Sequence, residues 1–140
     1  MTTLGPGTRR RLNDELRKVD HAADGYIHRV KDQGGCGSCW AFAANTASEG
    51  TLAKKTNNKN VRHISEQHLV DCTLSVSSGG KKFDRQGDNL GPIDYNGWGC
   101  NGAWMHYAWR FQRDHGAMLE EDYPYASGRT GTPGKECKHD

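Results

Sequence analysis

Five cysteines, spread unevenly over 140 residues, constrain this chain more than any other feature of its sequence. Cys36 and Cys39 are three positions apart, whereas Cys72, Cys100 and Cys137 each stand alone. Because the count is odd, an oxidised chain can form two disulfides and keeps one thiol. Leu, Ile, Val and Phe together number only 19, a smaller share than the ~20% expected of an ordinary core. The fold therefore needs cross-links or aromatic side chains to supplement its core.

A C-x-x-C pair such as Cys36 and Cys39 has three common uses: half of a metal site, a redox disulfide, or one structural cysteine beside one reactive cysteine. A zinc site needs a second ligand pair, but the other cysteines are isolated and His63 and His68 are five positions apart. A thioredoxin-like pair usually has its tryptophan before the first cysteine, whereas Trp40 follows the second. The sequence favours the third use and leaves the first two as minority interpretations.

Length and charge limit the classes of partner. A chain of this size is one domain or part of a larger unit. Its 19 Lys and Arg residues nearly balance 17 Asp and Glu residues, so no strong field attracts nucleic acid or an anionic membrane. There is no apolar run of ~18 residues, and residues 1–14 lack the apolar stretch of a signal peptide. We expect no nucleic-acid partner, no membrane partner, no metal and no cofactor.

Three segments have the composition of helices. The first, residues 39–55, is rich in alanine, ends in lysines and has apolar side chains at near-helical spacing, namely Trp40, Ala43, Ala44, Ala47 and Leu52. The second, residues 64–72, has Ser65 as a candidate N-cap. The third, residues 101–116, ends at Gly116, a typical C-terminal stop, and has one apolar stripe of Trp104, Tyr107, Ala108 and Phe111.

The remaining segments have weaker patterns. Residues 1–18 are arginine-rich and poor in apolar side chains, which indicates an N-terminal extension or the remnant of a pro-segment. Residues 25–30 alternate apolar and polar side chains, as in a short strand or an extended segment. Residues 73–99 contain six glycines and almost no periodicity, so we expect a long surface insertion there. The folded unit would then comprise residues 19–140.

Cys39 would be the first residue of the first expected helix. At that position a thiol faces unpaired backbone N–H groups and the positive end of the helix dipole, which stabilise a thiolate. Gln33, six residues upstream, is placed to direct its side-chain amide toward an oxyanion, with the Cys39 N–H as a second donor. These features indicate a cysteine nucleophile, which leaves Cys36 for a structural role.

Several motifs occur in series. The stretch VKDQGGCGSCWAFA, residues 30–43, resembles the nucleophile motif of the papain-like cysteine proteases, the family of papain and the cathepsins. The segments ISEQHLVDC, GCNGAWM and GAMLEEDYPYAS are similar to other stretches of that family, in the same order. The resemblance extends from Val19 to Cys137. It implies an α+β papain-like fold, of which this chain is the mainly helical left-hand domain, built around a central helix that starts at the nucleophile.

The resemblance also implies roles for individual residues. Cys39 would be the nucleophile and Gln33 the oxyanion-hole donor. The disulfides would be Cys36–Cys100 and Cys72–Cys137, each stabilising the domain by ~4 kcal/mol in the loop-entropy model. Residues expected to contact a peptide substrate are Gly37, Trp40, Gly102, Ala103, Trp104 and Met105.

The sequence departs from the family pattern at several positions. Ala103 replaces a glycine and could crowd an extended substrate, His21 replaces a tryptophan, and the loop at 73–99 is longer than usual. The family's catalytic histidine and asparagine lie ~130–150 residues after the nucleophile, in a β-rich right-hand domain. None of the seven histidines of this chain stands in that context, so we expect them to be packing or surface residues.

The sequence therefore predicts part of a cysteine endopeptidase that is inactive without its right-hand domain. The alternative is a non-catalytic binding or inhibitory module of the same fold. Expected partners are a peptide or protein substrate, the missing right-hand domain and, through the apolar surface that domain would cover, a second copy of this chain. The family and the disulfides imply a lysosomal or extracellular location.

Overall fold

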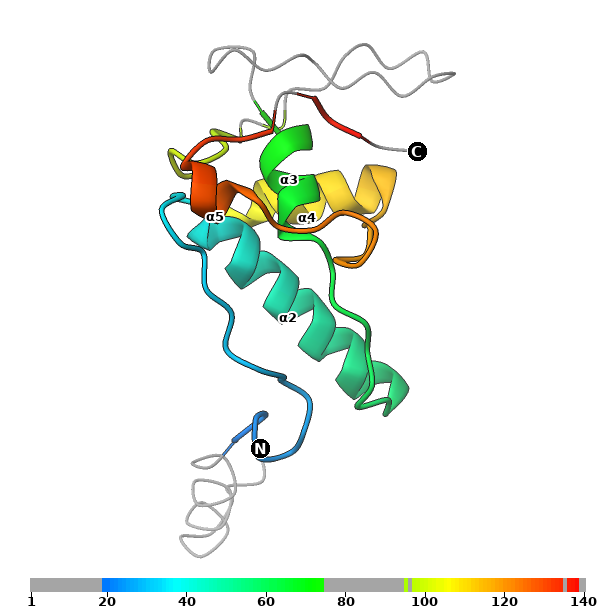
Figure 1. The fold of residues 1–140 in the computed structure, drawn as a ribbon. Coiled ribbons are helices and arrows are strands. Elements are labelled where there is room, and N and C mark those ends of the chain that lie inside the picture. Colours follow the sequence, from blue (N-terminus) through cyan, green and yellow to red (C-terminus); the bar gives the residue numbers. More distant parts are fainter. Residues whose placement is uncertain (1–18, 75–94, 96, 135, 139–140) are drawn as a thin grey trace, which may run out of the picture.

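The computed structural model describes residues 19–74, 95, 97–134 and 136–138. Four helices lie in this part of the chain: α2 (Cys39–Thr56), α3 (Glu66–Cys72), α4 (Met105–His115) and α5 (Ser127–Thr130). Figure 1 shows α3, α4 and α5 gathered around the N-terminal half of α2, while the segment before α2 runs beside it. The described residues form no strand, only three isolated β-bridges. The predicted mainly helical domain around a central helix is confirmed.

Helix α2 begins at Cys39, as the sequence predicts, and ends one residue beyond the expected limit. The alanine-rich sequence favours a long helix, and Lys54 and Lys55 in the last turn complement its dipole. Asn57 ends the helix in a left-handed conformation with φ 50°. Its backbone N–H points to the carbonyls of the last turn, so the end of α2 is capped.

The buried face of α2 does not follow the spacing of its apolar residues. Trp40 and Ala44 are buried, but the other residues at that spacing, Ala43, Ala47 and Leu52, are exposed. The helices α3 and α4 cover only one side of α2, and this side includes the polar residues Asn45 and Glu49. Hydrogen bonds from Asn45 to the Ile64 carbonyl and from the Ile64 N–H to Glu49 compensate for their burial.

The two other long predicted helices are present. The hydroxyl of Ser65 accepts a hydrogen bond from His68 N at 3.0 Å, so Ser65 is the N-cap of α3. Helix α4 ends at His115 with Gly116 as its C-cap, the predicted stop, but it begins at Met105, four residues after the expected start. The preceding residues are held in a non-helical path, because Gly37 N donates to Cys100 O at 2.8 Å.

The core combines a few large side chains with two disulfides. Its buried members are Trp40, Ala41, Ala44, Leu69, Val70, Cys72, Tyr95, Ala108 and Phe111. The disulfides are Cys36–Cys100 and Cys72–Cys137, the pairings that the family resemblance implies. Cross-links thus tie the start of α2 and the end of α3 to distant parts of the chain.

Other sequence predictions have different outcomes. Residues 25–30 form a turn followed by irregular backbone rather than a strand. The proposed extension at 1–18 and most of the proposed insertion at 73–99 lie outside the described residues. A search of the described helices finds none with the length and apolar character required to span a bilayer.

Candidate active site

The candidate nucleophile lies at an exposed helix end. Cys39 is the first residue of α2, its side chain is exposed, and it is the one cysteine outside the two disulfides. The first N–H groups of an α-helix have no partner within the helix. The Cys39 thiol therefore lies at the end of α2 that carries the unpaired backbone N–H groups.

The loop before Cys39 is fixed by close backbone contacts. The disulfide Cys36–Cys100 anchors it, and Gly37 pairs with Asn101 in a parallel bridge. A Cβ atom at Gly37 would lie 2.3 Å from the carbonyl oxygen of Cys100. Glycine is therefore required at this position by the approach of a second backbone segment.

The candidate oxyanion donor Gln33 lies at the start of the same loop. Its side-chain Nε2 donates a hydrogen bond to Cys36 O at 2.9 Å. A carboxamide has two N–H groups, so this bond orients the amide and leaves one proton for another acceptor. The side-chain amide of Gln33, the oxyanion donor expected from the sequence, is thus held in one orientation.

Two residues near the loop were not selected from the sequence. The hydroxyl of Tyr125 donates to Gln33 O at 2.8 Å and lies 2.7 Å from Ser38 Oγ. The sequence contains no local signal for these contacts, because Tyr125 is 87 positions from Ser38. The indole of Trp98, two residues before Cys100, is 52% exposed.

The expected substrate-contact residues divide into three groups. Trp40 is a correction: its side chain is 1% exposed, its Nε1 donates to Gly99 O, and the ring belongs to the core. Ala103 is half-buried and packs against the core cluster. Gly102, Trp104 and Met105 line an accessible surface, where Gly102 has φ 98° and open space beside it.

A buried charge network supports the chain just before the loop. Lys31 Nζ lies 3.1 Å from Glu49 Oε1 and 2.7 Å from Glu66 Oε1, which links α2 with α3. The carboxyl group of Glu120 faces the same network, and its Oε1 accepts a hydrogen bond from Tyr125 N at 3.0 Å. Burial raises the pKa of Glu120, and the nearby Glu66 raises it further. These ion pairs fix the backbone at Lys31, two residues before Gln33, against α2 and α3.

Four of the described histidines have contacts away from Cys39. His28 and His63 meet edge to face, and His63 Nδ1 lies 3.3 Å from Glu49 Oε2. His68 packs against Phe111 in the core. His115 Nε2 lies 2.6 Å from Tyr95 OH, whose pKa is raised to about 12 mainly by burial. These contacts agree with packing roles. Within the described residues, no three His, Cys, Asp or Glu side chains are grouped to hold a metal ion.

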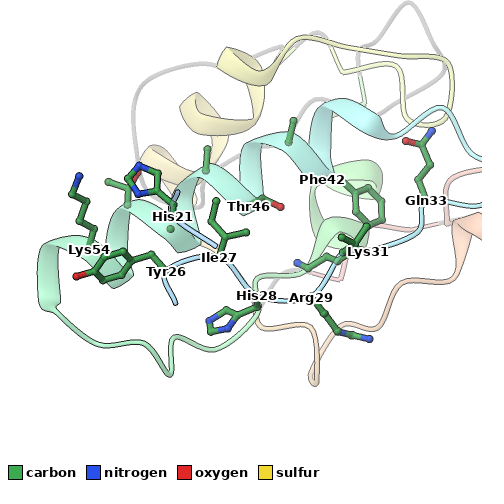
Figure 2. A pocket seen from close by; sticks show the side chains of 15 residues that line it. His21, Tyr26, Ile27, His28, Arg29, Lys31, Gln33, Phe42, Thr46 and Lys54 are labelled. Atoms are coloured by element: carbon green, nitrogen blue, oxygen red, sulfur yellow. The ribbon is translucent and has the colours of Figure 1, made fainter. Parts of the chain in front are cut away.

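A groove of about 680 Å³ extends from Gln33 along α2. Figure 2 shows Gln33 and Phe42 toward one end of this groove and Tyr26 and Lys54 toward the other. The wall opposite α2 is residues 26–31, including Ile27 at 39% exposure. The groove thus lies on the face of α2 where alanines are exposed.

Comparisons with family models and with known proteins indicate the same family. The family described as papain family cysteine protease matches residues 16–140. The chain is 42% identical over 108 residues to a protein named probable cysteine protease RD21C from Arabidopsis thaliana, covering 76% of this chain and 19% of that protein. It is 37% identical over 115 residues to cathepsin L2 from Homo sapiens, covering 81% of this chain and 28% of that protein.

The fold is also similar to that of a solved structure. Digestive procathepsin L 3 of Tenebrio molitor larval midgut superposes with a TM-score of 0.59 at 35% sequence identity. The match covers 81% of this chain and 29% of that structure. The matched part of this chain therefore covers less than a third of the length of each of these similar proteins.

Proposed function

The chain belongs to the papain family of cysteine proteases, and from that premise we propose that it carries the nucleophile half of a peptidase site. The observation that carries this proposal is the position of Cys39, an exposed free thiol on the first residue of α2. The adjoining loop is cross-linked through Cys36 and holds the Gln33 amide in place.

The proposed chemistry begins with attack by the Cys39 thiolate on the carbonyl carbon of a scissile peptide bond. A C–S bond forms and the carbonyl oxygen becomes an oxyanion. The Cys39 N–H and the second N–H of the Gln33 amide would stabilise that charge. Collapse expels the amine and leaves an acyl group on sulfur, which water then removes.

Two proton transfers in this sequence need a general acid and base. The leaving amine must receive a proton, and the attacking water must lose one. We propose that a histidine oriented by an asparagine performs both steps, and that these residues belong to a β-rich half beyond this chain. Two observations support this: the matched segment covers only 19% and 28% of the similar proteins, and His63, His68 and His115 have other contacts.

The substrate proposed for the complete site is a peptide or protein segment. Gly102 offers an open backbone position, and the neighbouring side chains of Trp104 and Met105 are 65% and 38% exposed. An extended peptide could therefore lie past Gly37 and Gly102 with apolar side chains against this wall.

The groove beside α2 is the surface proposed to meet the complementary half. It starts at Gln33, so a domain seated there would stand next to Cys39. Its exposed side chains Ile27 and Val30, at 39% and 97%, are apolar surface that such a domain would cover.

The competing assignment, a non-catalytic binding or inhibitory module, has less support. One reason to consider it is that Ala103 could crowd a substrate, but this residue packs against the core. The two disulfides favour an oxidising compartment, which supports the proposed lysosomal or extracellular location.

Hydrolysis of a fluorogenic dipeptide substrate tests whether the chain needs the proposed second half for activity. We expect the chain alone to show no hydrolysis above the background of a Cys39→Ser variant, because the proton transfers lack their base. Hydrolysis that disappears in Cys39→Ser would show that this chain needs no second half. Failure of iodoacetamide to modify Cys39 in the folded chain would contradict its assignment as nucleophile.

A further inference from the structure

Tyr125 bridges the two ends of the loop that leads to Cys39. Its hydroxyl donates to Gln33 O at 2.8 Å, and Ser38 Oγ lies 2.7 Å from the same phenol oxygen. A phenol has one O–H proton, and Tyr125 donates it to the backbone carbonyl of Gln33. The Ser38 hydroxyl is therefore the donor in the second hydrogen bond. A single chain of hydrogen bonds therefore runs from Ser38 through Tyr125 to Gln33.

The ring of Tyr125 is itself held by the two main helices. It meets the ring of Phe42, on α2, edge to face, with the two ring centroids 4.9 Å apart at an interplanar angle of 90°. The next two residues donate backbone hydrogen bonds to Gln67 Oε1 on α3, Ala126 N at 2.8 Å and Ser127 N at 2.9 Å. Gln67 is 3% exposed, so this anchor is shielded from water.

A second contact presses the same segment against the loop. Gly35 N donates to Gly128 O at 2.8 Å. A Cβ atom at Gly34 would lie 2.6 Å from Gly128 O, so the two backbones are in direct contact. The loop thus rests on residues 125–128 over its whole first half.

These contacts bear on the oxyanion hole. Its two candidate donors, the Gln33 amide and the Cys39 N–H, belong to opposite ends of the loop. Tyr125 contacts Gln33 itself and Ser38, the residue bonded to Cys39. Catalytic donors must be held within a fraction of an ångström of their working positions, and a small displacement costs rate.

We propose that Tyr125 is a positioning residue for the oxyanion hole, whose hydroxyl fixes the Gln33 amide relative to the Cys39 N–H. This inference rests on the proposed function, since it takes Cys39 as nucleophile and Gln33 as donor. Burial raises the pKa of the Tyr125 hydroxyl, although the Ser38 bond opposes this, so the phenol keeps its proton for Gln33.

The test compares two reactions of the Cys39 thiol in the full chain. Acylation by p-nitrophenyl acetate passes through a tetrahedral oxyanion: sulfur bonds to the carbonyl carbon, and nitrophenolate leaves with the electron pair without needing an acid. Alkylation by iodoacetamide displaces iodide at a saturated carbon and forms no oxyanion. The ratio of the two second-order rate constants therefore reports on the oxyanion hole and cancels differences in thiolate content and access.

We expect Tyr125→Phe to lower this acylation-to-alkylation ratio about tenfold, with the pH profile of alkylation unchanged. Gln33→Ala should lower the ratio by at least as much. The double variant should resemble Gln33→Ala alone, because Tyr125 acts through that residue. The matched control is Tyr123→Phe, which removes a buried hydroxyl bonded to Asp71, away from the loop, and should leave the ratio unchanged.

Each outcome separates the two proposals. A lowered ratio in Gln33→Ala with an unchanged ratio in Tyr125→Phe would overturn the role of Tyr125 and leave the proposed function standing. An unchanged ratio in Gln33→Ala would instead overturn the oxyanion assignment. If Tyr125→Phe does not fold, Ser38→Ala provides the test: it removes the other link of the same hydrogen-bond chain and should also lower the ratio, and an unchanged ratio would count against the proposal.

Discussion

Individual atoms determine the shape of the loop before Cys39. Three contacts of this loop would be lost with other side chains. They are the close approach of Gly37 to the Cys100 carbonyl, the hydrogen bond of the Gln33 amide and that of the Tyr125 hydroxyl. None of these contacts depends on hydrophobic burial. The loop is therefore sensitive to small substitutions that would be harmless in a typical surface loop.

Gly37→Ala should destabilise the fold by ~2–3 kcal/mol, because the added methyl would lie 2.3 Å from the Cys100 carbonyl. Urea denaturation with both disulfides intact measures the change. Gly50→Ala, within α2, is the matched control: its Cβ would have only ordinary contacts with Tyr26 and Ile27, at 3.5 Å and beyond. That variant should be neutral or up to ~1 kcal/mol more stable. Equal effects in the two variants would contradict the account.

Glu120 gives the fold a dependence on pH. Its pKa in the folded chain is raised from 4.5 by burial and by Glu66. The folded state therefore keeps a proton that the unfolded state has lost, and stability falls as pH rises from about 4.5 through the raised pKa. Glu120→Gln should remove this part of the decline, so that the variant gains stability relative to the parent chain as pH rises.

Urea midpoints between pH 4 and pH 7 test this prediction. Glu121→Gln is a suitable control, because the Glu121 side chain is 63% exposed and its ion pair among the described residues is with the equally exposed side chain of Arg62. It should follow the parent chain across this range. A Glu120→Gln curve parallel to that of the parent would show that this carboxyl group titrates normally.

At the scale of elements, local signals located the helices but not their packing. Ser65 and Gly116 mark helix ends through hydrogen bonds and dihedral angles formed by neighbouring residues, so the sequence predicts them. The burial of Asn45 and Glu49 depends on α3, α4 and the residues before α3, which lie elsewhere in the sequence. The spacing of the apolar residues in α2 therefore does not identify its buried face. The start of α4 was missed for a similar reason, the long-range attachment of Cys100.

Ser65→Ala tests the best-defined helix end. The hydroxyl accepts from His68 N and donates to Tyr123 O at 2.6 Å, and Ser65 is fully buried. Its removal should cost ~1–2 kcal/mol of unfolding free energy, measured by thermal or urea denaturation. Thr51→Ala, which truncates an exposed side chain of α2, should change stability by less than ~0.5 kcal/mol. A Ser65→Ala variant as stable as Thr51→Ala would refute the cap.

At the scale of the molecule, the candidate site is built from segments far apart in the chain. The family motifs locate Cys39 and Gln33, since these lie in one continuous stretch. They do not reveal that Trp40 is buried or that Tyr125 touches the loop, because both facts depend on the closed fold. Only the structure shows that the loop is supported from behind by residues 125–128.

The open groove beside α2 should make the isolated chain associate. Its exposed apolar side chains include Val30 at 97% and Ile27 at 39%. Multi-angle light scattering over a range of concentrations should show dimers or larger species. Ala47→Lys, a charge on the groove wall, should reduce this association, whereas Glu121→Lys, on another exposed segment, should not. A clean monomer at all concentrations would contradict the prediction.

The most direct test of the central claim is a burst experiment with p-nitrophenyl acetate, followed by mass spectrometry of the protein. The account predicts release of one equivalent of nitrophenolate for each chain, an acetyl group on Cys39, and slow release of that group because the base is lacking. The Cys39→Ser variant should show no burst. Acetylation only at lysines, or a burst of the same size in Cys39→Ser, would contradict the assignment of Cys39 as the nucleophile.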